Sequence, residues 1–180
     1  MNDLALHLLD IVQNSITAGA SLITILLDEQ PAKGTLILSI SDNGKGMTAE
    51  QLAQVTDPYF TSRTTRKVGL GIPLFKQSAE ATGGQLLITS TVNVGTTTAA
   101  LFGYHHIDRL PIGNMPNAIM LLVSANTEID FTYTYRYNDK EYVFDTKEVK
   151  EVLEGSPLNH PAIIKYLEEM IDENMKMLKF

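Results

Sequence analysis

The stretch that most constrains the fold is residues 41–47, which read Ser-Asp-Asn-Gly-Lys-Gly-Met. The stretch begins at the last residue of an apolar run, residues 35–41, and this run predicts a buried strand. Asp42 offers a fixed carboxylate that can accept a hydrogen bond, and Gly44 and Gly46 let a flat ligand approach the backbone without a Cβ in the way. Asp-Asn-Gly and Gly-x-Gly are also ordinary turn sequences. The stretch therefore predicts either a plain turn or a ligand-contacting loop.

Composition limits the classes of protein to which the chain can belong. Its 180 residues, 44% of them hydrophobic, suit one domain with an appendage or two small domains. It has no cysteine, which excludes disulfides, thiolate metal sites and a cysteine nucleophile. A net charge of −7 argues against a nucleic-acid surface, and the longest apolar runs, such as 118–123, are too short to span a bilayer. We expect a soluble, cytoplasmic protein without a nucleic-acid or membrane partner.

Residues 3–18 predict a helix, because apolar side chains recur there at helical spacing. A narrow polar stripe runs along one side of this helix. Its members are Asp3, His7, Asp10, Asn14 and Thr17. A stripe of this kind is either a solvated face or the wall of an internal cleft, and both interpretations fit the sequence.

Residues 22–27 and 35–41 predict two strands, and Thr48 predicts the N-cap of a short helix over 49–55. Two further strands are predicted over 85–91 and 97–102.

Between these pairs of strands, a loop with three cations leads into a glycine-rich helix start. The cations are Arg63, Arg66 and Lys67, and the helix begins at Gly69-Leu70-Gly71 and runs to about residue 81. Free backbone N–H groups, the positive end of the helix and the cations meet at this place, which indicates a site for an anion.

Four short motifs thus follow one another along the first hundred residues. They are Asp10-x-x-x-Asn14, Asp42-x-Gly44-x-Gly46, Gly69-Leu70-Gly71 and Gly95-Thr96-Thr97. Their order resembles the ATP-binding domain shared by histidine kinases, gyrase, mismatch-repair ATPases and heat-shock chaperone ATPases, over roughly residues 3–102. The resemblance implies an α+β fold, a two-layer α/β sandwich, with ATP and Mg²⁺ as ligands.

The resemblance also assigns roles to individual residues. It implies that Asn14 holds the Mg²⁺ that bridges the phosphates and that Asp42 accepts a hydrogen bond from the adenine amino group. Gly44 and Gly46 would let the base lie close to the backbone, and Thr97 would add a hydroxyl near the adenine.

The phosphates would be wrapped by the glycine-rich helix start, Gly69, Leu70 and Gly71. Arg63 or Lys67 would close over them as a lid.

Two departures from the family's pattern bear on catalysis. Members that hydrolyse ATP have Glu at the position of Asp10, and a base displaced by more than 1 Å can lose on the order of 100-fold in rate. Asp10 is therefore either a weak general base or a residue that orients water. In addition, the motifs begin within the first few residues, so we expect no helical hairpin with a phosphoacceptor histidine before the domain, and His7 on the polar stripe is not expected to take that role. The acceptor would then belong to a separate protein.

The resemblance stops at about residue 104, which predicts a domain over 1–103 and a small α+β appendage over 104–180. The appendage is predicted to contain a helix over 114–124, a hairpin and two further helices over 147–153 and 161–178. The hairpin strands are 131–137 and 141–145, with Tyr135 opposite Tyr142 and Tyr133 opposite Phe144. We expect this unit to pack on its own final helix and to contact a protein partner.

Two functions fit these features. The first is a Mg²⁺–ATP-binding protein that acts as a phosphotransferase on a separate partner or as a slow ATPase. The second is a non-catalytic, nucleotide-responsive binding module whose lid and appendage control a partner protein. Asp10 in place of Glu favours the second, whereas the intact Mg²⁺ and lid motifs favour the first.

Overall fold

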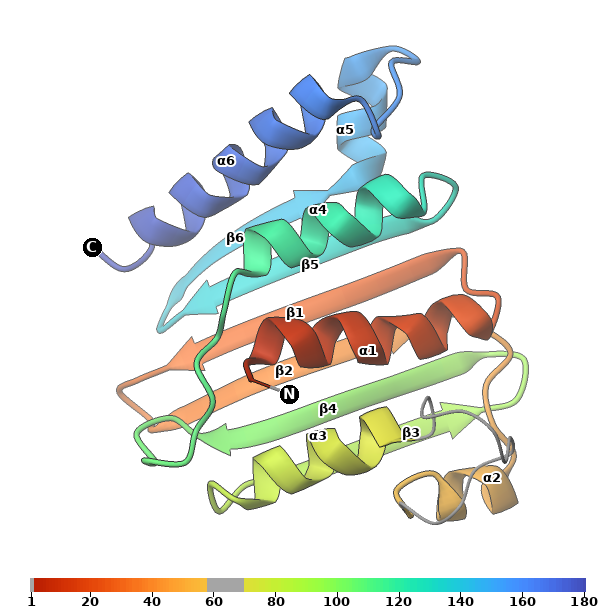
Figure 1. Cartoon of the computed structure of the whole chain (residues 1–180), viewed down its shortest axis with the longest axis vertical. Coiled ribbons are helices and arrows are strands. Elements are labelled where there is room, and N and C mark those ends of the chain that lie inside the picture. The colour runs from red at the N-terminus through yellow and green to blue at the C-terminus, as the bar shows by residue number, and fades with distance from the viewer. Residues whose placement is uncertain (1, 58–69) are drawn as a thin grey trace.

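A computed structural model describes residues 2–57 and 70–180, which form a two-layer α+β fold as predicted. One layer is a six-stranded sheet with the order β3-β4-β2-β1-β5-β6 (Figure 1). The strands are β1 (Leu22–Gln30), β2 (Thr35–Asp42), β3 (Gln85–Thr91), β4 (Gly95–Gly103), β5 (Asp130–Tyr137) and β6 (Lys140–Asp145). The helices are α1 (Leu4–Thr17), α2 (Ala49–Gln54), α3 (Gly71–Glu80), α4 (Met115–Ala125), α5 (Thr146–Leu153) and α6 (Pro161–Met177).

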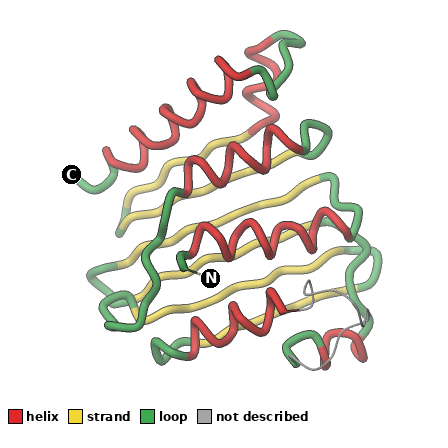
Figure 2. Tube along the Cα trace, in the orientation of Figure 1, coloured by secondary structure: helices red, strands yellow, loops and turns green. Residues whose placement is uncertain are grey.

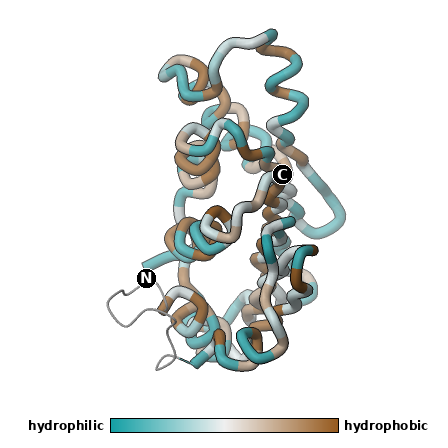
Figure 3. The backbone as a smooth tube through the Cα atoms, turned by 90° about the vertical axis from the view of Figure 1, so that its right-hand side faces the viewer, coloured by the Kyte–Doolittle hydropathy of each residue, from teal (hydrophilic) through white to brown (hydrophobic). Residues whose placement is uncertain are grey.

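The helices α1, α3 and α4 lie across one face of the sheet (Figures 1 and 2). Buried and half-buried residues alternate along β1 and along most of β2, because successive strand side chains point to opposite faces. The buried set faces the helices, and it includes Ile23 and Ile25 of β1 and Leu36 and Leu38 of β2. Hydrophobic and hydrophilic residues also alternate along the helices (Figure 3), and α1, α3, α4 and α6 each bury apolar residues against the core. Within the described residues, no helix is both long and apolar enough to cross a membrane.

The helix α1 begins and ends within one residue of its predicted bounds, and the side chain of Asp3 caps it by accepting a hydrogen bond from the N–H of Leu6 at 2.8 Å. Its polar stripe faces the neighbouring helix at the N-terminal end, because His7 is fully buried against α3 and Asp10 is half-buried. At these two residues the stripe is therefore not a solvated face but packs against α3, whereas Asn14 is exposed.

The predicted hairpin is confirmed with its register. β5 and β6 are joined by a two-residue loop, Tyr135 lies opposite Tyr142, and Tyr133 lies opposite Phe144. The hairpin also packs on the last helix, since the hydroxyl of Tyr133 donates to the sulfur of Met175 at 3.4 Å.

The sheet continues across the predicted domain boundary between residues 103 and 104. β5 pairs with β1 in parallel along eight residues, from the pair Leu22 and Asp130 to the pair Glu29 and Tyr137. Residues on both sides of the boundary share one hydrophobic core, and Leu4 of α1 donates its N–H to the carbonyl of Pro111 at 3.0 Å. The hairpin and α4 thus extend the layers that the first half builds, and a boundary at 103 remains a prediction.

Candidate functional site

The carboxylate of Asp42 is fixed at the end of β2. The hydroxyl of Ser15 on α1 donates to its Oδ2 at 2.6 Å, and the N–H of Gly44 donates to its Oδ1 at 2.8 Å. Asp42 remains only partly buried. A carboxylate has about four acceptor positions, so two donors leave capacity for a ligand.

The glycines that follow Asp42 are required by packing within the protein. A Cβ on Gly44 would lie 2.8 Å from the Cβ of Ala18, and a Cβ on Gly46, which has a φ of 69°, would collide with the carbonyl of Thr91. The loop also donates the N–H of Lys45 to the carbonyl of Ala18 at 2.9 Å. It is therefore held between the end of α1 and the end of β3, which gives a reason for both glycines besides ligand approach.

Asp10 and Asn14 lie one turn apart on α1, and Asp10 lies beside the start of α3. The carboxylate of Asp10 is directed at the first residue of α3, because a Cβ on Gly71 would collide with its Oδ2. Burial raises the pKa of Asp10 above its ordinary value. Asn14 is exposed, so its amide oxygen is open to a ligand from solvent.

The start of α3 presents the first N–H groups of a helix, and no side chain of the described residues caps them. Leu70 stands at the N-cap position without a side-chain capping bond, and Gly71 is buried. The first N–H groups of a helix have no partner within the helix and carry partial positive charge, so they suit an anion. The predicted lid residues Arg63 and Lys67, and the predicted phosphate-binding Gly69, lie outside the described residues.

The structure does not place the side chain of Thr97 on the same face of the sheet as the carboxylate of Asp42. Thr97 pairs with Ser41, and their hydroxyls form a hydrogen bond. The neighbouring pair, Asp42 and Thr96, must point to the opposite face because side chains alternate along a strand. The side chain of Asp42 contacts Ser15 of α1, so it lies on the helix-covered face of the sheet. Thr96 therefore lies on that same face, next to Asp42.

Ser15 is the residue that the sequence reasoning missed at this site. It occupies a buried position four residues after Ile11, on the apolar side of α1. A lone hydroxyl on an otherwise apolar stripe is a signal that could have identified it.

His7 joins α1 to α3 and lies away from solvent. Its Nε2 lies 3.0 Å from the hydroxyl of Ser78, and its ring centroid lies 5.1 Å from that of Phe75. Its Nδ1 has no hydrogen-bond partner among residues 2–57 and 70–180. Burial lowers its pKa to about 4, so the imidazole is neutral at pH 7. A fully buried ring is not accessible to a phosphoryl donor, which agrees with the expectation that His7 is not an acceptor.

The described side chains provide no ready-made metal cluster. No group of three or more histidines, aspartates or glutamates in residues 2–57 and 70–180 is placed to hold a metal ion. A magnesium ion at Asn14 would therefore take most of its ligands from phosphate oxygens and water, which is the usual manner of Mg²⁺ binding with nucleotides.

Comparison with solved structures identifies the fold. The ATPase domain of Aquifex aeolicus MutL, complexed with ADP, aligns with a TM-score of 0.57 at 13% identity, over 86% of this chain and 70% of that one. Residues up to 104 make up less than 86% of this chain, so part of the alignment with the MutL domain lies beyond residue 104.

Comparison by sequence identifies relatives among sensor kinases. Sensor histidine kinase ZraS of Klebsiella oxytoca is 36% identical over 72 residues, which are 40% of this chain, and sensor histidine kinase YvrG of Bacillus subtilis is 30% identical over 84 residues, which are 44%. The aligned part makes up 14% of each of these kinases.

The family model described as histidine kinase-, DNA gyrase B-, and HSP90-like ATPase matches residues 2–104, which are more than half of the chain. The order of the motifs, the two-layer fold and this match agree. The chain therefore belongs to the family of histidine kinase-, DNA gyrase B- and HSP90-like ATPases.

Proposed function

We propose that the chain binds Mg²⁺–ATP between α1, the loop after β2 and the start of α3. The observation that carries this proposal is the fixed carboxylate of Asp42, which Ser15 and Gly44 hold with acceptor capacity to spare. The adenine amino group would donate to Asp42, and the phosphates would meet the first N–H groups of α3. Asn14 would hold the Mg²⁺, which neutralises phosphate charge when bound.

The supporting arrangement differs from the sequence-based expectation in one residue. Thr96, rather than Thr97, lies on the helix-covered face directly across from Asp42. We therefore propose Thr96 as the hydroxyl beside the adenine. Arg63, Lys67 and Gly69 remain proposed phosphate contacts.

We further propose that the bound ATP serves phosphoryl transfer to a separate protein, or slow hydrolysis. Asp10 lies beside the start of α3, where the terminal phosphate would be, and its raised pKa makes it a stronger base than an ordinary aspartate once it is ionised. Its reach is one methylene shorter than that of Glu. Asp10→Ala should leave ATP binding intact and lower turnover, and Asp10→Glu should raise turnover if reach is the limit.

The alternative is a nucleotide-responsive module that does not turn over ATP. The half-burial of Asp10 favours it, since a carboxyl pressed against Gly71 has little room for an attacking water. In either case the partner would contact residues 104–180. Exposed apolar side chains of that region support this, namely Val152, Tyr166, Met177 and Phe180.

Calorimetry with Mg²⁺–ATP tests the binding proposal. Asp42→Asn places an amide N–H₂ group within reach of the adenine amino group and removes a charge-assisted hydrogen bond, so ATP affinity should fall by about ten- to hundredfold, the equivalent of 1.5–3 kcal/mol. Asp139→Asn in the β5–β6 turn removes an exposed aspartate and is the matched control, with unchanged affinity expected. The proposal fails if the unmodified chain binds neither ATP nor ADP with Mg²⁺ present.

Incubation with γ-labelled ATP separates the two functions. Phosphate release, or labelling of a second protein in cell extract, supports catalysis, and Asp10→Ala should reduce either signal. Tight ATP binding with no release and no labelling supports the non-catalytic module.

A further inference from the structure

A cavity of about 460 Å³ lies between the start of α4, one side of α6 and Glu29 near the end of β1. It is distant from the candidate nucleotide site. Ile23, six residues before Glu29 in β1, pairs with Asp42, and at about 3.3 Å per residue the two places are about 20 Å apart along the strand. A volume in this range suits a small molecule.

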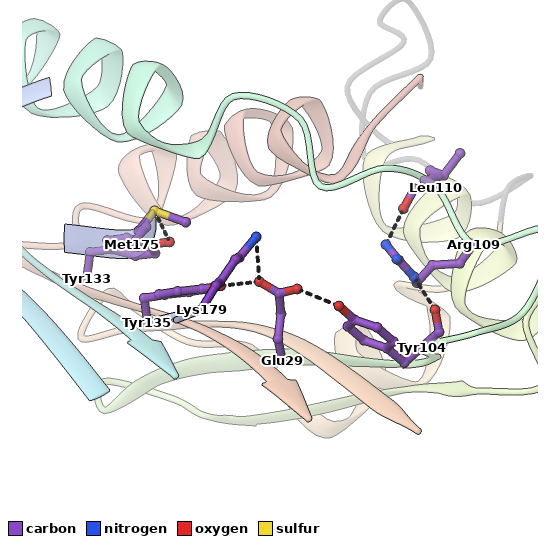
Figure 4. Close-up of polar contacts among 8 residues, drawn as sticks. All are labelled: Glu29, Tyr104, Arg109, Leu110, Tyr133, Tyr135, Met175 and Lys179. Atoms are coloured by element: carbon purple, nitrogen blue, oxygen red, sulfur yellow. Dashed lines mark hydrogen bonds and ion pairs between the residues drawn. The ribbon is translucent and has the colours of Figure 1, made fainter. Parts of the chain in front are cut away.

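The base of the cavity is a buried carboxylate. Glu29 is 1% exposed, and it accepts hydrogen bonds from the hydroxyls of Tyr135 and, at 3.0 Å, Tyr104 (Figure 4). Burial raises the pKa of Tyr104 to about 12 and also raises that of Tyr135, so both remain protonated donors. Neutral donors satisfy the oxygen atoms but leave the charge unbalanced. Buried carboxylates in proteins are usually paired with a cation.

The cation near Glu29 is loosely placed. Nζ of Lys179 lies 3.8 Å from its Oε2, which is longer than a direct hydrogen bond (Figure 4). The side chain of Lys179 is 45% exposed. Because Glu29 is buried, the ammonium of Lys179 can leave only when another cation takes its place beside the carboxylate. Lys179 therefore shows that a primary ammonium group fits beside Glu29.

The remaining walls suit a cation with an alkyl stem. The cavity is lined by more carboxylates than ammonium groups. The four carboxylates belong to Glu29, Glu168, Glu169 and Asp172, and the two ammonium groups belong to Lys176 and Lys179. The ammonium of Lys176 is already paired, since it lies 2.8 Å from the carboxylate of Asp172. Apolar side chains also line the cavity, and they belong to Ile112, Pro116 and Met175. A negative excess attracts a cation, and the apolar walls would cover its methylene groups.

We propose that this cavity binds a small molecule carrying a primary alkylammonium group, with Glu29 as its counter-ion. Lys179 is the tethered occupant that the ligand displaces. The apparent affinity of such a site is the intrinsic affinity multiplied by the fraction of time for which the tethered group leaves it vacant.

The test uses n-butylammonium as the probe and follows amide chemical shifts of the full chain by NMR. Saturable shifts at the cavity are expected in the millimolar range. Lys179→Ala should bind the probe about two- to tenfold more tightly, if Lys179 fills the site for between half and nine-tenths of the time. Lys165→Ala, which removes an exposed lysine of α6 that does not line the cavity, is the matched control and should bind like the unmodified chain. Absence of saturable binding to Lys179→Ala overturns the proposal.

Two further arms test the chemistry. A butyl chain ending in trimethylammonium has no N–H to donate and should bind at least about tenfold more weakly, which is the value of one charge-assisted hydrogen bond. Equal binding of the two cations overturns the assignment to Glu29. Glu29→Gln should abolish binding while keeping the side-chain shape, and unchanged affinity in that variant also overturns the proposal. If Glu29→Gln does not fold, Glu169→Gln on the cavity wall replaces it, with a loss of up to about fivefold expected.

Discussion

The buried imidazole of His7 makes the stability of this protein dependent on pH in a specific window. The ring is fully buried between α1 and α3, its Nδ1 has no partner, and burial lowers its pKa to about 4. An unfolded histidine has a pKa of about 6.5. Between these values the unfolded chain binds a proton that the folded chain does not, so the free energy of unfolding falls as the pH falls below about 6.5.

The two pKa values give the size of the effect. At pH 8 neither state is protonated at His7, and the difference is close to zero. At pH 5 the unfolded histidine is almost fully protonated and the folded one is not, which costs about 2 kcal/mol of stability. For a chain of this length that loss corresponds to a fall of about 4–8 °C in Tm.

The assay is urea unfolding at pH 8 and pH 5 for the unmodified chain and for His7→Gln, which keeps a polar side chain that does not titrate. The stability advantage of the unmodified chain over His7→Gln should shrink by about 2 kcal/mol between the two pH values. His105→Gln removes an exposed histidine and is the matched control. Equal pH dependence in the unmodified chain and His7→Gln would refute the argument that burial keeps this ring neutral.

Three other outcomes follow from the structure. In urea unfolding, Gly46→Ala should lower the free energy of unfolding by at least about 1 kcal/mol more than Gly83→Ala does. Both glycines have a positive φ, but only a Cβ on Gly46 collides with the carbonyl of Thr91. Equal losses of stability would contradict the packing argument. Burial disfavours the charged form of Asp10, so the unmodified chain should lose stability relative to Asp10→Asn as the pH rises from about 3.8 through the raised pKa of Asp10. Above that pKa the difference in stability should stay constant. The same difference at every pH across this range would show that Asp10 titrates normally. Truncation after Phe102 should lower the thermal midpoint and expose the β1 edge, because it removes β5; a truncated chain that keeps its stability and binds ATP would support the domain boundary at 103.

Local patterns in the sequence determined the elements and the family. The 3.6-residue period of residues 3–18, the apolar run over residues 35–41 and the Thr48 N-cap each depend on neighbours within a few positions. The hairpin register also followed from the sequence, because a two-residue loop fixes which residues face each other, as it does for Tyr135 and Tyr142. The order of the glycine and acid motifs was enough to indicate the ATPase family.

The tertiary structure decided which side chains meet. The sequence placed Thr97 near Asp42 by motif, but strand pairing puts Thr96 on the helix-covered face, because the register between β2 and β4 joins segments more than fifty residues apart. The sequence also gave no sign that β5 would pair in parallel with β1. That pairing joins strands about a hundred residues apart, and no local preference encodes it. The contacts of Ser15 with Asp42, and of Lys179 with Glu29, arise in the same way. Local chemistry sets the elements, and packing between distant elements sets the sites.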